Sequence, residues 1–271
     1  MLVPPTPVAT RYNGAPTRIS WSPDGRRLLY VSFGRAMGNG NNNLTIRSAE
    51  TGEERFLATS LRNVWDVAWA PDSRSLLAMG MTVAGNAQFR VDTETGEITK
   101  LADGRWAPRM SQDGKVMVYM AEGKIRRRNI ETGEDVAVEN LGTNTFADLS
   151  PDGREIVFRR DGAVYAVSLD GGEPRELFRR PEYHVLTWTR DGRYIIAEAL
   201  DSKTGLPPAT SEVWRIPARG GTPLRLDLRI AGMDRFALHP DNRHFAFSVD
   251  EGTKNELWVM ERFLPPLKTA K

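Results

Sequence analysis

The sequence contains no cysteine and only three histidines. Without cysteine, the chain forms no disulfide bond, uses no catalytic thiol and offers no thiolate ligand to zinc. The sequence also lacks a run of 18 uncharged apolar residues, and its first ten residues lack the basic start and apolar run of a secretory signal. We therefore expect a soluble chain, cytoplasmic by default, or periplasmic if it is a mature or excised domain.

An excess of one charge sign is missing as well. The 37 Lys and Arg residues nearly balance the 35 Asp and Glu residues, and the two signs are interspersed along the chain. Such a balance gives no reason to expect nucleic acid or an anionic membrane as a partner. With 40% hydrophobic and 27% charged residues, the composition is that of an ordinary globular protein with enough apolar side chains for a sizeable core.

One short motif, Trp-Ser-Pro-Asp-Gly-Arg in its first copy, occurs six times with small variations. Its aspartates are Asp24, Asp72, Asp113, Asp152, Asp191 and Asp241, at intervals of 48, 41, 39, 39 and 50 residues. Proline presets the first dihedral angle of a tight turn, aspartate bonds to nearby backbone, and the following Gly, Ser or Asn tolerates an unusual φ. Each copy is therefore predicted to be a hairpin turn, although Gln112 and Arg190 replace the proline in two copies and should loosen their turns.

Short apolar, β-rich segments flank every copy of the motif. The segments that follow it are Leu28–Phe33, Leu76–Met81, Val116–Met120, Ile156–Phe158, Tyr194–Ala197 and Phe245–Val249. A further strand follows in each unit, and in five units a second turn leads to a fourth strand. This repeat predicts an all-β, six-bladed propeller with four antiparallel strands per blade, as one domain over residues 1–271. A linear solenoid is the alternative.

The large apolar residue that opens each motif suits a wedge buried between adjacent blades. The last unit lacks a fourth strand before Pro265 and Pro266, whereas about ten residues precede the first unit. We expect Val3–Ala9 to supply the outermost strand of blade six, where prolines are tolerated.

With these motifs, the chain resembles the TolB-like, WD-type propeller repeats of bacterial TolB proteins and of the propeller domains of prolyl-oligopeptidase-type peptidases. The resemblance covers nearly the whole chain. The segment Glu256–Pro265 resembles the end of propellers that form the last domain of larger bacterial regulatory or sensor proteins, and this resemblance implies a C-terminal domain of a larger protein. TolB proteins bind protein partners through the propeller, so the resemblance implies protein recognition.

Catalytic motifs are missing from the sequence. There is no Gly-x-Ser-x-Gly elbow of the hydrolase domain that accompanies the peptidase propellers. His239 and His244 flank the last motif and suit a polar turn surface, and Asp92–Glu97 resembles a calcium loop but has counterparts in the same hairpin of other units. We therefore predict no enzyme, no metal and no cofactor.

A recognition site is predicted on the face opposite the motif turns, because function in repeat folds lies in the variable loops. Two long loops, Gly34–Asn43 and Asp201–Ser211, lie on this face. Six and seven residues before each motif aspartate, the chain enters its first strands around the channel mouth. The predicted partner-binding residues there are Arg18, Trp65, Asp66, Trp106, Phe146, His184, Asp234 and Arg235.

The competing interpretation of this ring is that its aromatic residues pack between blades and its charges pair with neighbours. Arg109 and Asp148 are expected to form a structural ion pair near the channel.

We expect a monomer that binds an unidentified protein or peptide. Two alternatives stay open: a small-molecule sensor domain of a larger protein, and a calcium-dependent enzyme of lactonase or lyase type using Asp66, Asp148 and Asp234.

Overall fold

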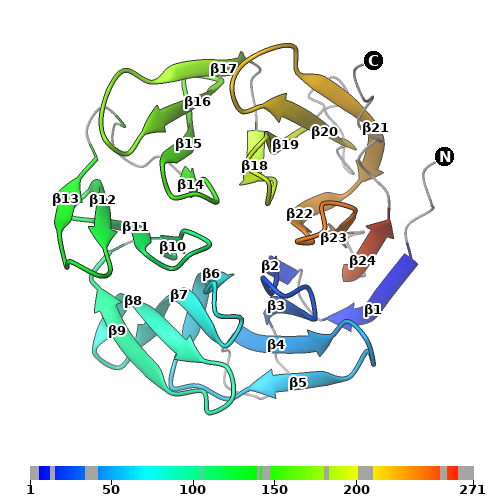
Figure 1. Cartoon of the computed structure of the whole chain (residues 1–271). Helices are drawn as coiled ribbons and strands as arrows, with labels where there is room; N and C mark the ends of the chain where they lie inside the picture. Colours follow the sequence, from blue (N-terminus) through cyan, green and yellow to red (C-terminus); the bar gives the residue numbers. More distant parts are fainter. Residues whose placement is uncertain are drawn as a thin grey trace.

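The computed structural model describes residues 6–12, 16–33, 42–104, 106–138, 141, 147–179, 183–200, 210–250 and 255–261. Six four-stranded antiparallel sheets stand around a central axis like the blades of a propeller (Figure 1). The predicted all-β, six-bladed architecture is therefore confirmed. No helix in this part of the chain is long and apolar enough to cross a membrane.

The first five blades each consist of four consecutive strands, numbered from the channel outward. Blade one contains β2 (Pro16–Trp21), β3 (Arg27–Phe33), β4 (Asn42–Ser48) and β5 (Glu54–Leu57). Blade two contains β6 (Asn63–Trp69), β7 (Ser75–Thr82), β8 (Gly85–Asp92) and β9 (Ile98–Ala102). Blade three contains β10 (Arg109–Met110), β11 (Val116–Ala121), β12 (Lys124–Asn129) and β13 (Asp135–Ala137). Blade four contains β14 (Ala147–Leu149), β15 (Glu155–Arg160), β16 (Ala163–Ser168) and β17 (Arg175–Arg179). Blade five contains β18 (Tyr183–Trp188), β19 (Tyr194–Leu200), β20 (Thr210–Pro217) and β21 (Leu224–Ala231).

The sixth sheet draws its strands from both ends of the described chain. It contains β22 (Met233–Leu238), β23 (His244–Asp250) and β24 (Asn255–Glu261), and β1 (Thr6–Tyr12) pairs with β24 in antiparallel register. The pairing places Thr6 opposite Val259 and Tyr12 opposite Asn255, with two irregularities between them. The N-terminal strand thus runs further along the chain than the predicted Val3–Ala9, whose first three residues lie outside the described part.

The six motif turns share one geometry. In each copy a carboxylate oxygen of the motif aspartate accepts the backbone N–H two residues later, at 2.7–3.1 Å. The residue after the aspartate has positive φ in every copy, from 54° at Ser73 to 74° at Gly114. Glycine adopts this conformation at no steric cost, and serine and asparagine tolerate it. The predicted roles of the motif aspartate and of the residue after it are therefore confirmed.

Gln112 and Arg190, which replace the usual proline, do not disturb this geometry. Gly114 and Gly192 have φ values of 74° and 67°, like the glycines of the other turns. The backbone N–H of Gln112 donates to the carbonyl oxygen of Pro151 in the next blade at 2.9 Å. That of Arg190 donates to Oδ1 of Asn242 at 3.1 Å. Proline has no N–H and could make neither bond, so these substitutions link neighbouring turns instead of loosening them.

The hydrophobic core lies between adjacent blades, not in one central mass. One cluster joins Leu29 of blade one to Trp69 of blade two, and four more lie between blades three and four, four and five, five and six, and six and one. The indole N–H of Trp69 donates to the carbonyl oxygen of Ser20 in the preceding blade at 3.1 Å. Trp188 makes the equivalent bond to the carbonyl of Asp148 at 3.3 Å. These motif tryptophans are the predicted wedges, and burial of each contributes roughly 1.5–3 kcal/mol.

The motif carboxylates make the stability of the fold sensitive to acid. Partial burial opposes ionisation of Asp24, but hydrogen bonds from the Ser22 hydroxyl and the Arg26 N–H outweigh it and lower the pKa of Asp24. A carboxyl with a lower pKa in the folded state contributes stability that is present above its unfolded pKa, near 3.8, and is lost as the pH falls further. We expect the urea midpoint to fall steeply below about pH 4. The variant Asp24→Asn should show a smaller change of midpoint between pH 6 and pH 3, and an unchanged pH dependence would contradict this account.

Candidate functional site

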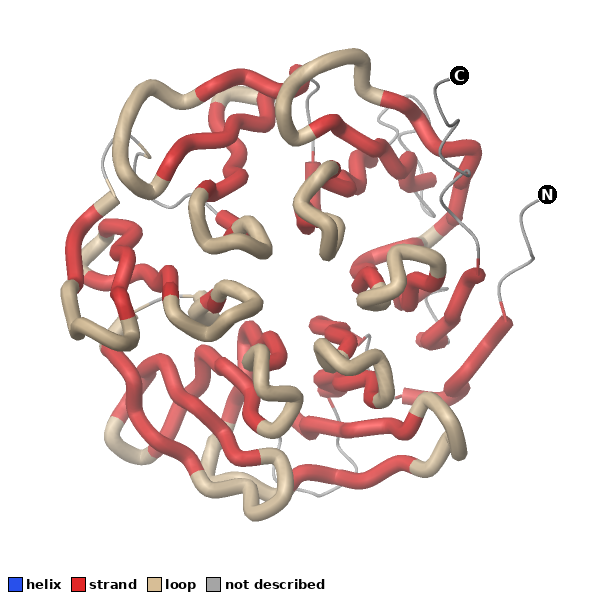
Figure 2. Tube along the Cα trace, viewed as in Figure 1, coloured by secondary structure: helices blue, strands red, loops and turns tan. Residues whose placement is uncertain are grey.

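The inner strands of the blades enclose a cavity of about 510 Å³ along the propeller axis. Figure 2 shows the loops that join the first two strands of the blades gathered near the centre of the ring. Charged side chains dominate the polar part of the lining. They are Arg18, Asp66, Arg109, Asp148, Arg159 and Arg235.

Asp66 on β6 connects three blades beside this cavity. It is buried to 2% exposure, and its Oδ1 accepts Nε–H of Arg18 from blade one at 3.1 Å. Its Oδ2 accepts the backbone N–H of Ala107 at 2.9 Å and a guanidinium N–H of Arg109 from blade three at 3.2 Å. The N–H of Val67 completes the set at Oδ1. A buried carboxylate needs such donors, since unpaired burial of a charge is strongly unfavourable.

Arg109 extends the chain of contacts to the next two blades. Its Nε lies 3.7 Å from Oδ1 of Asp148 on β14, so the predicted ion pair is confirmed. Asp148 in turn accepts the backbone N–H of Trp188 in blade five at 3.2 Å. Together with Arg18 and Asp66, these groups form a continuous series across blades one to five. We call Arg18, Asp66, Arg109 and Asp148 the channel belt.

The belt changes the acidity of its members. Burial raises the pKa of the Asp148 carboxyl, against the opposing charge of Arg109 and hydrogen bonds from Trp188 and Leu149. Burial also disfavours the charged form of Arg109, but Asp66 and Asp148 outweigh it and raise the pKa of that guanidinium. For Arg18 burial prevails, reinforced by the positive charges of Arg235 and Arg109, and its pKa is lowered. The guanidinium groups of Arg109 and Arg235 thus lie close enough to Arg18 to disfavour its charged form.

Positive charge exceeds negative charge in the cavity wall. Four guanidinium groups and two carboxylates line it, and both carboxylates form ion pairs with arginines of the belt. Such a wall attracts an anionic group, and arginine provides planar, bidentate hydrogen bonding to carboxylates.

Trp106 places a large aromatic surface at the edge of the same cavity. Its side chain is 37% exposed, and its backbone has a φ of +67°. A bulky residue with positive φ is uncommon and is held there at a conformational cost of about 1–3 kcal/mol. Backbone outliers of this kind cluster at ligand-binding sites, so Trp106 is the strongest single indication of a site here.

The structure brings four of the eight predicted partner-binding residues to one cavity, namely Arg18, Asp66, Trp106 and Arg235. Trp65 is 39% exposed but does not line the cavity. Phe146, the side chains of His184 and Asp234, and residues 34–41 and 201–209 of the two long loops lie outside the described part of the chain.

The sequence prediction missed Arg159. This residue lies on β15, the second strand of blade four, yet it lines the cavity. Burial lowers the pKa of its guanidinium, against the nearby charge of Glu198 in blade five. The predicted ring was counted only along the first strands, so it could not include a residue of a second strand.

Several solved structures have the same propeller architecture. The architecture matches TolB from Acinetobacter baumannii with a TM-score of 0.67 and 19% identity, over 87% of this chain and 63% of that one. It matches a putative TolB from Agrobacterium tumefaciens with a TM-score of 0.66 and 19% identity, over 94% and 92% of the two chains. The fold is that of the TolB-like propellers. An oligogalacturonate lyase in complex with manganese has a similar fold, with a TM-score of 0.61 and 13% identity over 98% of both chains.

Comparison of the sequence with protein families and with curated proteins finds fewer similarities. No protein-family model matches the chain. A Bacillus subtilis protein named as an uncharacterized peptidase, YuxL, is 26% identical over 193 residues. This match covers 66% of the present chain but only 28% of the Bacillus protein. At these levels of identity the likeness establishes the fold and leaves the activity to be argued from the site.

The channel belt predicts that Asp66→Asn destabilises the protein strongly. The substitution leaves the guanidinium groups of Arg18 and Arg109 partly buried without their shared counter-charge, and loss of one partner of a buried pair costs about 3–5 kcal/mol. Asp103→Asn is a matched control, because Asp103 pairs with Lys100 on the surface and such pairs contribute about 1 kcal/mol or less. Urea unfolding followed by tryptophan fluorescence measures both. Equal losses of unfolding free energy for the two variants would show that the belt stabilises the fold no more than a surface ion pair does.

Proposed function

We propose that this propeller is a non-catalytic binding module that holds an acidic segment of a protein partner at its channel mouth. The observation that carries the proposal is the combination of an exposed, conformationally constrained Trp106 with a cavity wall in which guanidinium groups outnumber carboxylates. Tryptophan and arginine are the residues most enriched in the energetic centres of protein interfaces. Their union in one cavity supports recognition of a peptide that offers both a carboxylate and an apolar contact.

The belt supports this role by fixing the guanidinium groups before a ligand arrives. Arg18 is held through Asp66, and Arg109 through both Asp66 and Asp148. Arginine carries a large rotamer entropy, and binding is stronger when that freedom is already lost in the free protein. The site is therefore proposed to be preorganised for an anion.

A calcium-dependent enzyme has less support. Asp66 and Asp148 are the two acids that line the cavity in the described residues, and each already accepts backbone N–H groups and faces a guanidinium. Calcium requires six to eight oxygen ligands, which two engaged carboxylates do not provide. A peptidase activity would need a nucleophile elbow, and the sequence contains none.

Labelled acidic peptides, together with copies in which every Glu is replaced by Gln, test the proposal by fluorescence anisotropy. We expect the acidic peptides to bind, the Gln copies to bind at least about tenfold more weakly, and affinity to fall as salt rises. Trp106→Ala and Arg235→Ala should each weaken binding about tenfold or more. Arg154→Ala is the matched control, because Arg154 lies exposed on a motif turn away from the cavity.

Two outcomes would count against peptide recognition. Equal affinity of the acidic and Gln peptides would remove the electrostatic basis of the site. Binding of free dicarboxylates as tight as that of the peptides, unaffected by Trp106→Ala, would favour the small-molecule sensor instead.

We also propose that β1 closes the ring by completing blade six. Its pairing with β24 supplies a fourth strand and covers an edge that would otherwise be open to association with another chain. Deletion of residues 1–12 should lower the melting temperature by at least about 5 °C, whereas deletion of residues 1–5 leaves β1 intact and should change it little. Addition of a peptide of residues 1–12 should restore stability to the shorter chain. Equal melting temperatures for the two deletions would refute closure by β1.

A further inference from the structure

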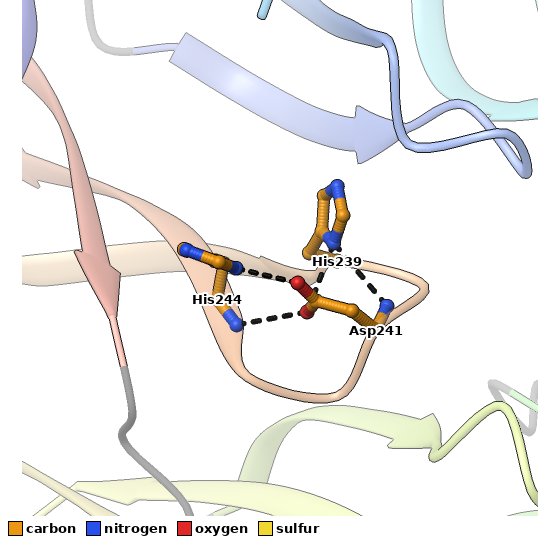
Figure 3. Close-up of side chains that lie close together, drawn as sticks. All are labelled: His239, Asp241 and His244. Carbon is orange, nitrogen blue, oxygen red and sulfur yellow. Dashed lines mark hydrogen bonds and ion pairs between the residues drawn. The ribbon is translucent and has the colours of Figure 1, made fainter.

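The motif turn of blade six differs from the other five in carrying two imidazoles. His239 occupies the position of a hydroxyl residue in four other turns, and His244 follows the motif directly. Both lie against Asp241, as Figure 3 shows. One nitrogen of each histidine and one carboxylate oxygen of Asp241 lie within 4.8 Å of one another.

The other turns show what this position needs structurally. The Ser22 hydroxyl donates to Asp24 at 2.6 Å, and Ser111, Ser150 and Thr189 make the same bond in their own turns. Where blade two has alanine instead, the Ser75 hydroxyl donates to Asp72 at 2.8 Å. One hydroxyl is therefore enough to complete the turn, and two imidazoles exceed that requirement.

Hydrogen bonds fix the tautomer of His239. Its Nε2 lies 3.0 Å from the carbonyl oxygen of Gly25 in blade one. A carbonyl only accepts, so Nε2 carries the proton and donates it. Nδ1 then carries the lone pair, which accepts the backbone N–H of Asp241 at 3.2 Å, and a metal ion would replace that bond. Metal-binding histidines commonly donate their second N–H to a carbonyl or carboxylate in this way.

The lone pair of His239 faces a carboxylate. Its Nδ1 lies 2.9 Å from Oδ1 of Asp241. On the other side, Nδ1 of His244 lies 2.6 Å from Oδ2 of the same carboxylate. A contact this short between a ring nitrogen and a carboxylate oxygen is stabilised by a cation between them, either a proton or a metal ion. Three donors bonded to zinc at about 2.0–2.2 Å stand roughly 3.3 Å apart, so small shifts would let these atoms share one ion.

We propose that His239, Asp241 and His244 bind one divalent transition-metal ion of the zinc class. Two imidazole nitrogens and one carboxylate oxygen suit zinc, cobalt, nickel or copper, and do not suit calcium or magnesium, which require oxygen donors. His244 loses the proton on its coordinating nitrogen when the ion binds.

The position of the site gives the ion a structural role. His239 links the turn of blade six to Gly25 of blade one, so the ion would anchor the contact between these two blades. A Cβ atom at Gly25 would stand 2.5 Å from Nε2 of His239, which shows how closely the two turns pack. An ion that binds the folded state alone raises the melting temperature by mass action.

Co²⁺ and Zn²⁺ titrations of the metal-free full chain test the site. We expect one Co²⁺ per chain with visible absorption bands, displacement by Zn²⁺, no competition from Ca²⁺, and a melting temperature that rises by a few degrees with Zn²⁺. His239→Ser and His244→Ser should each weaken binding at least about tenfold and abolish the thermal shift. Both restore the serine used in other turns, and circular dichroism of the metal-free variants checks that they fold.

His184→Ala is the matched control, because it removes the third histidine of the chain and leaves the turn intact. It should bind Co²⁺ like the wild type. Absence of Co²⁺ and Zn²⁺ binding by the wild type would overturn the proposal. Undiminished binding by folded His239→Ser or His244→Ser would do so as well.

Discussion

Contact between neighbouring blades is the constraint on which this structure depends. No disulfide crosses the ring, because the sequence has no cysteine, and each hydrophobic cluster spans one pair of adjacent blades. Stability in such a repeat architecture is close to a sum of the blades and of their interfaces. Three kinds of contact act at those interfaces: apolar wedges such as Trp69, bonds between motif turns such as Gln112 to Pro151, and the channel belt.

The belt joins stability to the proposed recognition. Asp66 receives donors from blades one, two and three, and the same bonds hold Arg18 and Arg109 in the cavity wall. The carboxylates that keep the blades together therefore also orient the cations offered to a ligand. Because guanidinium groups exceed carboxylates there, the lining retains a positive character after the belt is formed. A change that neutralises a belt acid would alter folding and binding together, whereas Arg235 and Trp106 lie outside the belt.

The sequence predicts the repeated features well because each rests on local chemistry. Asp24, with the glycine that follows it, defines a turn within six residues, and six copies at similar intervals imply six blades. The Arg109–Asp148 pair was also predictable, since the two residues occupy one position in adjacent repeats. Arg159 could not be found by that counting, because it lies on the second strand of its blade and the count followed the first strands. The positive φ of Trp106 has no sequence signal, since it lies between blades in an irregular segment.

The seam between blades six and one shows why similar repeats need not be equivalent. Trp69 and Trp188 each donate an indole hydrogen bond to the preceding blade, but the buried indole nitrogen of Trp21 has no such partner among the described residues. Its ring instead meets His239 edge to face, with centroids 4.8 Å apart. His239 also supplies the bond to Gly25, so its side chain links the motif turns of blades six and one. In chain order β1 of blade six ends at Tyr12 and β2 of blade one begins at Pro16, so the two blades are directly connected, and the break in the ring lies inside blade six, between β24 and β1. The two imidazoles, which the other motif turns lack, are therefore concentrated at the interface between blades six and one.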